Sequence, residues 1–472
     1  MSRFASTAVA FLAPLVATIS DASTYYLDAG SPTPTGDGRS PTTAWKTMIQ
    51  LQKTTLQPGD SVLFKRGSKW TNDSLKLDSR HSGSAEAPVV VSTYGNPADS
   101  APHLSNSGRV FGIHRGSHLV VEGLHFSGAR ASCIEIGDTG AHHIVIQDSE
   151  ADRCGAGVDI ARAREVVVRR NFLHDMKMIR NTKGDSGTAA DNDDYGAMGI
   201  VLTAANGCSI YQNHLKNCRD TSYDYGFDGG AVEAWGAVKN CDIYQNLAEY
   251  TDGFMEFGGA ATDTVRNVRI HHNLALESGT FSWIHVFDGS DIFGMHYDGL
   301  RIEHNTGVTR GRMVRFFFGG GGKLDDPEQI SIRNNILVTD SLKGGTYYKP
   351  PYAIGSNLIW APTNPFPTSF PAGPGDLWKD PKFVSAGDYS LQATSPARDA
   401  GMDRGYRTDY LGKSGWRGTA PDLGAFEFQE GEDHVGNLPR KALGPIQAKP
   451  RYDIRGVRAK FLRGWIDLLI SK

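Results

Sequence analysis

The sequence predicts an all-β solenoid in which one short strand recurs in every coil. A phrase of alternating apolar and polar residues occurs seven times, and every copy except the first ends at Asn. The copies occupy residues 144–149, 166–171, 208–213, 241–246, 268–273, 300–305 and 330–335. A phrase that recurs at a variable period of 22 to 42 residues is typical of a solenoid with loops of different length. The period-two alternation favours β-strands over helical repeats, and the recurring Asn predicts a ladder of side-chain amides at a tight turn.

The composition is consistent with this architecture and excludes some partners. The 472 residues include 55 glycines, as expected when each coil turns several corners. The net charge of −3 indicates no nucleic-acid partner, and we expect a monomer. The five cysteines form neither a dense disulfide framework nor a cluster with zinc spacing. Cys208 and Cys241 occupy equivalent positions in consecutive copies, where buried thiols are favoured over a disulfide across coils.

The N-terminal residues 1–23 have the features of a secretory signal peptide: a basic start, an apolar run and small residues near the end. A short buried helix is the alternative. Because no later apolar run is long enough to span a bilayer, the sequence predicts a secreted protein, extracellular or at the cell surface, with no membrane partner. Residues 431–472 are predicted to be a basic tail, either disordered or a sorting signal.

Between these ends, the chain divides into three predicted parts. Residues 24–105 are expected to form an N-terminal cap and the first coils, with one short helix at 48–56. Residues 106–340 carry the repeats, the ladder of amides and the loops around a groove. Residues 341–430 are rich in Pro and Gly and are expected to form the final coils and a C-terminal cap. Caps are needed because an open solenoid end exposes strand edges and core.

The opening segment, the Asn-terminated coils and the closing segment together resemble secreted proteins of the pectate-lyase-like superfamily. The resemblance covers most of residues 24–430. It implies a right-handed parallel β-helix with an N-terminal cap and an irregular C-terminal segment, and it implies a carbohydrate-active protein. The superfamily includes polysaccharide lyases, glycoside hydrolases and epimerases, so the resemblance does not choose among these reactions.

A second strand in each coil, upstream of the Asn phrase, predicts a column of functional side chains. When the strands are aligned by apolar-polar-apolar triplets, the central residues project outward and stack about 4.8 Å apart in successive coils. The predicted column is Glu135, Asp159, Val201, Glu233, Glu256, His285 and Arg315.

Glu233 and Glu256 are the predicted catalytic pair, because adjacent coils place two carboxyl groups near the 5–5.5 Å that a retaining glycosidase needs. Repulsion between them separates their pKa values, as an acid and a nucleophile require. His285 is expected beside Glu256, which we therefore assign as the acid/base. Asp159, His285 and Arg315 are expected to support catalysis or contact the substrate, and the aromatic residues Trp235, Trp283 and Tyr225 to bind sugar rings. The alternative is a charged surface that only serves solubility.

The loops at 174–194 and 219–228 precede strands of the column and are expected to form walls beside it. Asp194, Asp228 and Asp252 each lie shortly before a column position. The simpler interpretation is that these aspartates stabilise turns next to Gly or Tyr-Gly. The functional alternative is a calcium site formed by their carboxylate oxygens. No cofactor is required for the predicted hydrolysis, so calcium is an optional ligand in this interpretation.

The sequence therefore favours an extracellular glycoside hydrolase, with two alternatives left open. One is a polysaccharide lyase that removes the proton beside a uronate carboxylate, with or without calcium. Its base would be Arg315, His285, Lys177, Arg180 or Lys183. The other is a carbohydrate-binding solenoid without catalysis. The lyase ranks second because no Lys lies on any rung of the column.

Overall fold

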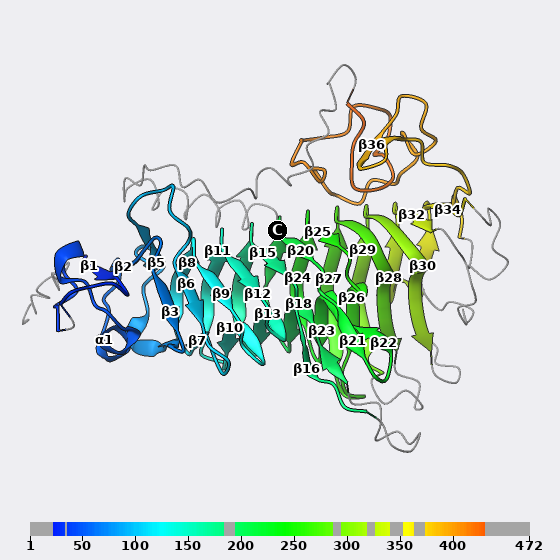
Figure 1. Cartoon of the computed structure of the whole chain (residues 1–472). Coiled ribbons are helices and arrows are strands. Elements are labelled where there is room, and N and C mark those ends of the chain that lie inside the picture. Colours follow the sequence, from blue (N-terminus) through cyan, green and yellow to red (C-terminus); the bar gives the residue numbers. More distant parts are fainter. Residues whose placement is uncertain are drawn as a thin grey trace, which may run out of the picture.

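The computed structural model describes residues 22–33, 35–183, 194–286, 294–318, 326–339, 353–362 and 373–429. The chain is a right-handed parallel β-helix, as predicted, with 49% of the described residues in strands and 4% in helices. Its coils stack along one axis, from the N-terminal blue strands to the yellow strands in Figure 1. The predicted signal peptide and basic tail lie outside the described residues, apart from the last two positions of the former. No helix in the described ranges is long and apolar enough to cross a membrane.

One side of the helix is a 12-stranded parallel sheet, here called sheet A, which contains the repeated phrases. Its strands follow each other in chain order: β1 (Thr24–Leu27), β2 (Ser61–Lys65), β5 (Val89–Tyr94), β8 (Ser117–Glu122), β11 (His142–Gln147), β14 (Arg164–Arg169), β19 (Ser209–Tyr211), β24 (Lys239–Tyr244), β27 (Thr264–His271), β29 (His296–Glu303), β31 (Ile330–Arg333) and β33 (Ala353–Gly355). The coils thus begin with β1, within the segment that was expected to hold the cap and first coils.

An 18-stranded sheet supplies the other two sides of each coil. Face B1 is the run that carries the predicted column: β4 (Leu75–Leu77), β7 (Phe111–His114), β10 (Ser132–Gly137), β13 (Ala156–Ala161), β18 (Met198–Thr203), β23 (Gly230–Trp235), β26 (Gly253–Gly258), and the later parts of β28 (Leu274–Val286) and β30 (Thr306–Phe318). Face B2 contains β3 (Lys69–Thr71), β6 (His103–Ser105), β9 (His125–Ser127), β12 (Glu150–Asp152), β15 (Phe172–His174), β20 (His214–Lys216), β25 (Leu247–Glu249), the first parts of β28 and β30, β32 (Ile336–Thr339) and β34 (Leu358–Trp360).

The core runs through the whole helix because alternate residues of every strand point inward. On face B1 these inward residues include Ile200, Leu202, Val232 and Ala234, all fully buried. Residues between them, such as Glu233, are half-buried on the outside. Each coil buries its apolar residues against the coils before and after it, so stability propagates along the axis rather than from one centre.

The predicted Asn ladder is present and is longer than the sequence indicated. Each ladder amide donates from Nδ2 to the Oδ1 atom of the next at 3.0 Å, from Asn171 to Asn357, and the Nδ2 of Asn357 donates to Asp376 at 3.2 Å. Left-handed backbone geometry occurs one residue earlier than expected. Positive φ angles belong to the residues before the amides, such as Gln212 (55°) and Gln245 (54°). Each amide also donates to a buried backbone carbonyl, as Asn213 does to Val168 (2.8 Å) and Asn246 to Ile210 (2.8 Å), so the ladder satisfies buried backbone groups.

The N-terminal end of the described helix is covered, and a C-terminal segment packs on the side of the later coils. Near the N-terminus, α1 (Met48–Lys53) confirms the short predicted helix and buries Met48 and Leu51 in the core. Short 3₁₀ helices lie at Pro41–Thr43, Ser79–His81 and Pro327–Gln329. Residues 373–429 contain the antiparallel pair β35 (Phe383–Ser385) and β36 (Asp388–Leu391) and fold over the later coils in Figure 1. The fully buried Glu303 anchors them, since it accepts hydrogen bonds from Arg404 (2.8 Å) and Tyr406 (2.9 Å).

The cysteines follow the prediction in part. Cys208, just before β19, and Cys241, on the neighbouring strand β24, are buried free thiols, as favoured from the sequence, and Cys218 is a third. A disulfide between Cys133 and Cys154 joins adjacent coils, and the sequence analysis did not identify it. Nothing in their sequence pattern marks these two as a pair, since they occupy different positions in their coils.

Candidate active site

The predicted column lies on the outside of face B1, and six of its seven positions are in the predicted register. Glu135 pairs with Asp159, Asp159 with Val201, Val201 with Glu233, and Glu233 with Glu256. All five side chains are half-buried, and each lies between two inward residues that are at most 1% exposed. Glu233 and Glu256 therefore occupy adjacent coils with no residue between them, separated by about the 4.8 Å of neighbouring strands.

The prediction for the next coil was wrong by two residues. Glu256 pairs with Trp283, and Trp283 pairs with Arg315, so His285 lies two positions farther along the strand and pairs with Phe317. The cause is Ser282, an inward residue that is 1% exposed. Because a polar residue occupies this core position, the apolar-polar-apolar triplet selected Ile284 and Val286 instead. Arg315 keeps its predicted rung, two coils beyond Glu256.

Glu233 lies in an environment that favours its protonated form. Burial raises the pKa of its carboxyl well above the usual range, and the charges of Glu256 and Asp228 raise it further. No cation is among the causes of the shift. A carboxyl group held neutral in this way can donate a proton near neutral pH, which is the requirement for a general acid.

Glu256 differs from Glu233 because it has a basic neighbour. The Nε2 atom of His285 is 3.5 Å from Glu256 Oε1, although the two residues are not paired in the sheet. The imidazole is 6% exposed and belongs to the next coil. The predicted contact between His285 and Glu256 is thus present, with a different backbone register.

Asp228 is the third carboxyl group of the site, and the sequence assigned it to a metal. It ends β22 (Gly226–Asp228), which pairs with β21 (Asp220–Ser222) in an antiparallel hairpin at the edge of face B1. Burial raises its pKa to about 7, and the nearby charges of Glu256, Asp252 and Asp194 contribute. Its Oδ1 accepts a hydrogen bond from the Gly229 backbone (2.7 Å). The charge of Asp228 in turn raises the pKa of Glu233.

Asp194, which was also assigned to the metal, links two loops. Its carboxylate accepts hydrogen bonds from the Thr182 backbone (2.6 Å), the Ser222 hydroxyl (2.8 Å) and the Asp224 backbone (3.1 Å). These bonds lower its pKa even though burial opposes the shift. The hairpin at 220–228 is held in this way against β16 (Met178–Arg180) and β17 (Tyr195–Gly196), which form a second hairpin. Both project from the lower edge of the green strands in Figure 1.

The structure does not gather Asp194, Asp228 and Asp252 into a group of ligands. In the described part of the chain, two sets of three metal-ligating side chains have ligand atoms within 4.8 Å of one another, and neither contains these aspartates. The sets are His118, His142 and His143, and His125, Glu150 and Asp152. The donors to Asp194 explain its position without a cation. A calcium ion at this place remains a prediction that the geometry does not favour.

Aromatic side chains are exposed beside the carboxyl groups. Tyr225 is 53% exposed on the hairpin, with Tyr223 and Phe227 at 66% and 50%. Trp235 is half-buried on the same strand as Glu233, and its ring lies where a side chain on Gly258 would come within 2.5 Å. Trp283 occupies the rung after Glu256. Tyr225 and Trp235 therefore lie beside the pair, and the exposed rings of the hairpin are available for stacking.

Asp159 belongs to a separate pair of carboxyl groups. Val201 lies between it and Glu233 in the column. Burial and the charge of Glu135 raise the pKa of Asp159 to about 6, whereas a hydrogen bond from Ser132 opposes this. Glu135 itself is paired with Arg109 Nε at 2.8 Å. Asp159 is thus too far along the column to contact Glu233 directly.

Of the residues proposed as the base of a lyase, Lys177, Arg180 and Lys183 lie beside the hairpin, whereas His285 and Arg315 lie on strands of face B1. Lys177 Nζ is 3.7 Å from Asp220, at the base of the hairpin, and Arg180 and Lys183 are exposed. In the described region, the groups that act on the pKa of Glu233 are carboxylates only. Carboxyl groups therefore dominate the centre of the site, where His285 contacts Glu256, and Lys177 lies at its edge.

The pKa of Asp228 predicts a pH-dependent gain of stability in Asp228→Asn. Between about pH 4 and pH 7, Asp228 is protonated in the folded protein and ionised in the unfolded chain. The free energy of unfolding of the wild type therefore falls as the pH rises through this range. The variant avoids this loss. We expect no gain at pH 4 and a gain on the order of 2 kcal/mol at pH 8, measured by urea unfolding.

The control is Asp298→Asn, which removes a carboxylate from the exposed edge of β29. Equal stability of Asp228→Asn and wild type at pH 8 would contradict the prediction, because it would mean that the buried carboxylate carries no cost.

Comparisons with known proteins place the fold. No protein family model matches the chain. A lacto-N-biosidase of Bifidobacterium longum subsp. longum is 30% identical over 93 residues, which is 19% of this chain and only 6% of that enzyme. The crystal structure of pectate lyase Pel9A is similar, with a TM-score of 0.57, 15% identity, and coverage of 87% of this chain and 98% of the lyase. XylC, solved in complex with xylose, has a TM-score of 0.50 and 10% identity over 86% and 98% of the two chains. These similarities show the parallel β-helix fold.

Proposed function

We propose that this protein is a glycoside hydrolase that cleaves an extracellular polysaccharide or oligosaccharide through Glu233 and Glu256. The observation that carries the proposal is the pair itself: two carboxyl groups on adjacent coils, one of which is held protonated by burial and by its neighbour. Retaining glycosidases use carboxyl groups about 5–5.5 Å apart, and neighbouring parallel strands supply this spacing.

The electrostatics support Glu233 as the acid/base and Glu256 as the nucleophile, the reverse of the assignment from the sequence. Glu233 donates its proton to the glycosidic oxygen while that oxygen leaves the anomeric carbon. The Glu256 carboxylate, which lies 3.5 Å from His285 Nε2, forms a bond to the same carbon. Glu233, now ionised, then removes a proton from water, which attacks the anomeric carbon and releases Glu256.

The surroundings support an uncharged sugar as the substrate. Glu256, Asp228, Asp252 and Asp194 all act on one another or on Glu233 as negative charges. A uronic acid polymer would bring further carboxylates to this acidic centre, where like charges repel. The exposed aromatic rings of the hairpin offer flat surfaces to the C–H faces of neutral sugars.

A lyase remains the second candidate, favoured by Lys177, Arg180 and Lys183 beside the hairpin, where a base could approach a bound uronate. It requires a cation that neutralises the substrate carboxylate. A carbohydrate-binding protein without turnover is the third candidate and predicts binding to face B1 alone.

The test is a panel of neutral and uronic acid glycans, each with and without EDTA. Pectate, xylan and lacto-N-biosides belong in the panel, because the names of the similar proteins point to them. New reducing ends and the ultraviolet absorbance of unsaturated uronates are recorded together. Reducing ends without absorbance, unaffected by EDTA, are expected. Absorbance that rises with reducing ends would replace the hydrolase with a lyase, and binding without either signal would indicate the non-catalytic alternative.

A further inference from the structure

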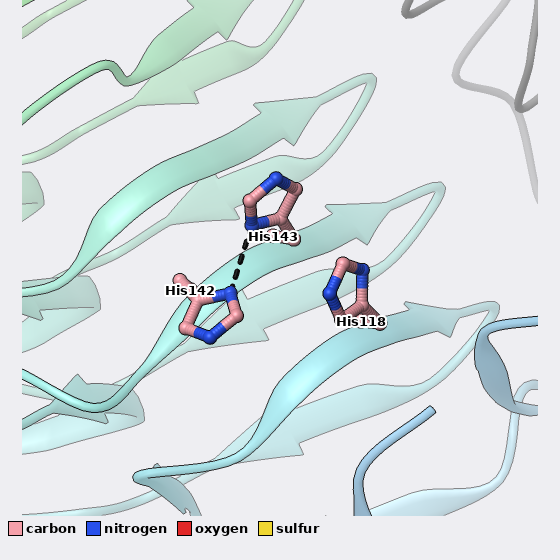
Figure 2. A group of neighbouring side chains, drawn as sticks. All are labelled: His118, His142 and His143. Atoms are coloured by element: carbon pink, nitrogen blue, oxygen red, sulfur yellow. Dashed lines mark hydrogen bonds between the residues drawn. The ribbon is translucent and has the colours of Figure 1, made fainter. Parts of the chain in front are cut away.

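Three histidines gather on the outside of sheet A, away from the carboxyl pair on face B1. His118 lies on β8, and His142 and His143 lie on the next strand, β11. Figure 2 shows the three rings over the same side of these strands, with His142 and His143 joined by a hydrogen bond. The ring centroids are 4.6 Å apart for His118 and His143, 4.9 Å for His142 and His143, and 5.3 Å for His118 and His142.

A left-handed corner brings the adjacent residues His142 and His143 to one side. Neighbours in a regular strand point to opposite faces, but φ is 53° at both His118 and His143 and 56° at Glu165. The flanking register pairs place these three residues opposite one another in successive coils. Later coils have the same positive φ at Gly207, Asn240, Asn267 and Gly299, residue types that tolerate it. Among the described coils, the corner position holds a histidine in β8 and β11 and a glutamate in β14, and these three coils are consecutive.

The polar atoms of the cluster converge. His142 Nδ1 is 2.8 Å from His143 Nδ1, so the two nitrogens share one hydrogen. His143 Nδ1 is also 3.0 Å from Glu165 Oε2, which Arg164 Nη1 contacts at 2.6 Å. The Nδ1 atom of His118 is buried and has no hydrogen-bond partner. One ligand atom from each histidine lies within 4.8 Å of the other two.

We propose that His118, His142 and His143, with Glu165, bind a divalent transition metal ion, for which Zn²⁺ is the expected occupant. Imidazole nitrogens bind zinc at 2.0–2.1 Å, which places two ligand nitrogens about 3.3 Å apart in tetrahedral geometry. Small rotations of the rings reach this spacing from the distances above. The ion replaces the hydrogen shared by His142 and His143 and supplies the partner that His118 Nδ1 lacks. Nitrogen donors select Zn²⁺, Ni²⁺ or Cu²⁺ over Ca²⁺ and Mg²⁺.

The remaining surroundings fit a metal ligand set. Burial lowers the pKa of all three histidines, which favours the neutral form that binds metals. Glu165 either contributes an oxygen ligand or orients His143, and Arg164 fixes its carboxylate in both cases. Because the ligands come from three consecutive coils, the ion ties β8, β11 and β14 together.

The test uses the full chain after treatment with a chelator, titrated with ZnCl₂ in a calorimeter. Wild type is expected to bind one Zn²⁺ with a micromolar or lower dissociation constant and to unfold at a higher temperature when zinc is present. His118→Asn and His143→Asn are the main variants, because Asn occupies this corner in β24 and β27 and preserves the backbone. Each is expected to weaken binding by at least about 10-fold, and Glu165→Gln by about 10–100-fold.

The matched control is His296→Ala, which removes an exposed histidine from β29 of the same sheet and should retain wild-type binding. Addition of Co²⁺ gives a second readout. The strong visible absorption of a tetrahedral Co²⁺ site is expected in the wild type and in His296→Ala, and it should be absent from His118→Asn and His143→Asn. The proposal is overturned if wild type shows no one-to-one binding, or if His118→Asn and His143→Asn bind Zn²⁺ as wild type does.

Discussion

Glu233→Gln is expected to lower kcat on a natural glycan by about 10²–10⁴-fold, because the amide cannot protonate the leaving oxygen. The isosteric change leaves the packing of β23 intact, so the unfolding temperature should not fall. The loss should shrink greatly on an aryl glycoside with an acidic phenol, whose departure needs no proton. The basic limb of the pH profile of kcat/KM should also disappear, since wild-type activity falls as the pH rises through the raised pKa of Glu233.

Glu256→Gln is expected to lower kcat by at least about 10³-fold on both kinds of substrate, since no bond to the anomeric carbon can form. Azide should restore part of the activity of Glu256→Ala on the aryl glycoside and give a glycosyl azide of inverted configuration. In Glu233→Ala, azide should give the retained configuration instead. The configuration of the azide product therefore shows which residue is the nucleophile and which is the acid/base. If Glu233→Ala gave the inverted product and Glu256→Ala the retained one, Glu256 would be the acid/base, as assigned from the sequence.

Two further variants decide whether the reaction occurs at this pair. Glu122→Gln removes a carboxylate from sheet A, where Glu122 accepts from Ser92 and Gln147, and should leave kcat unchanged. Asp159→Asn tests the other carboxyl pair on face B1, in which the pKa of Asp159 is raised to about 6. If Asp159→Asn abolishes turnover while Glu233→Gln and Glu256→Gln do not, the chemistry lies between Asp159 and Glu135 and the proposed mechanism is wrong.

The register of the column was predictable wherever the inward neighbours were apolar. From Glu135 to Glu256, each outward residue lies between two buried apolar side chains, and the alternation alone aligned the coils. It failed at Ser282, because the interior of a coil tolerates an occasional small polar residue. A shift of two residues preserves the outward face, so the pattern itself contains no signal of the error.

The features that the sequence did not reveal depend on geometry between loops or on backbone conformation. Asp194 pairs with Ser222 and Asp224 across two insertions, which no periodicity relates. The histidines at 142 and 143 are neighbours in a strand, and alternation places them on opposite faces. Only the positive φ of His143 brings them together, and residue type predicts such an angle weakly.

Asn246→Ala is expected to destabilise the protein by about 3–5 kcal/mol. Asn246 Oδ1 accepts hydrogen bonds from the backbone nitrogen and from Nδ2 of Asn213, both at 3.0 Å. Its own Nδ2 donates to the Ile210 carbonyl (2.8 Å) and to Asn273 (3.0 Å). The alanine leaves two buried donors of Asn213 without an acceptor, and each such group costs about 1–3 kcal/mol. Urea unfolding and the thermal midpoint measure the loss.

Asn246→Asp separates the role of the acceptor from that of the donor. The carboxylate keeps the oxygens that Asn213 needs, but it cannot donate to Ile210 and it brings a charge to a fully buried position opposite Asn273 Oδ1. We expect a loss at least as large as in Asn246→Ala at pH 8 and a smaller loss near pH 4, where a protonated carboxyl regains one donor. Asn206→Ala, at an exposed corner where Asn206 accepts from Asn240, should cost less than about 1 kcal/mol. A loss below 1 kcal/mol in Asn246→Ala would mean that water replaces the missing amide, and that shape rather than hydrogen bonding holds the coils in register.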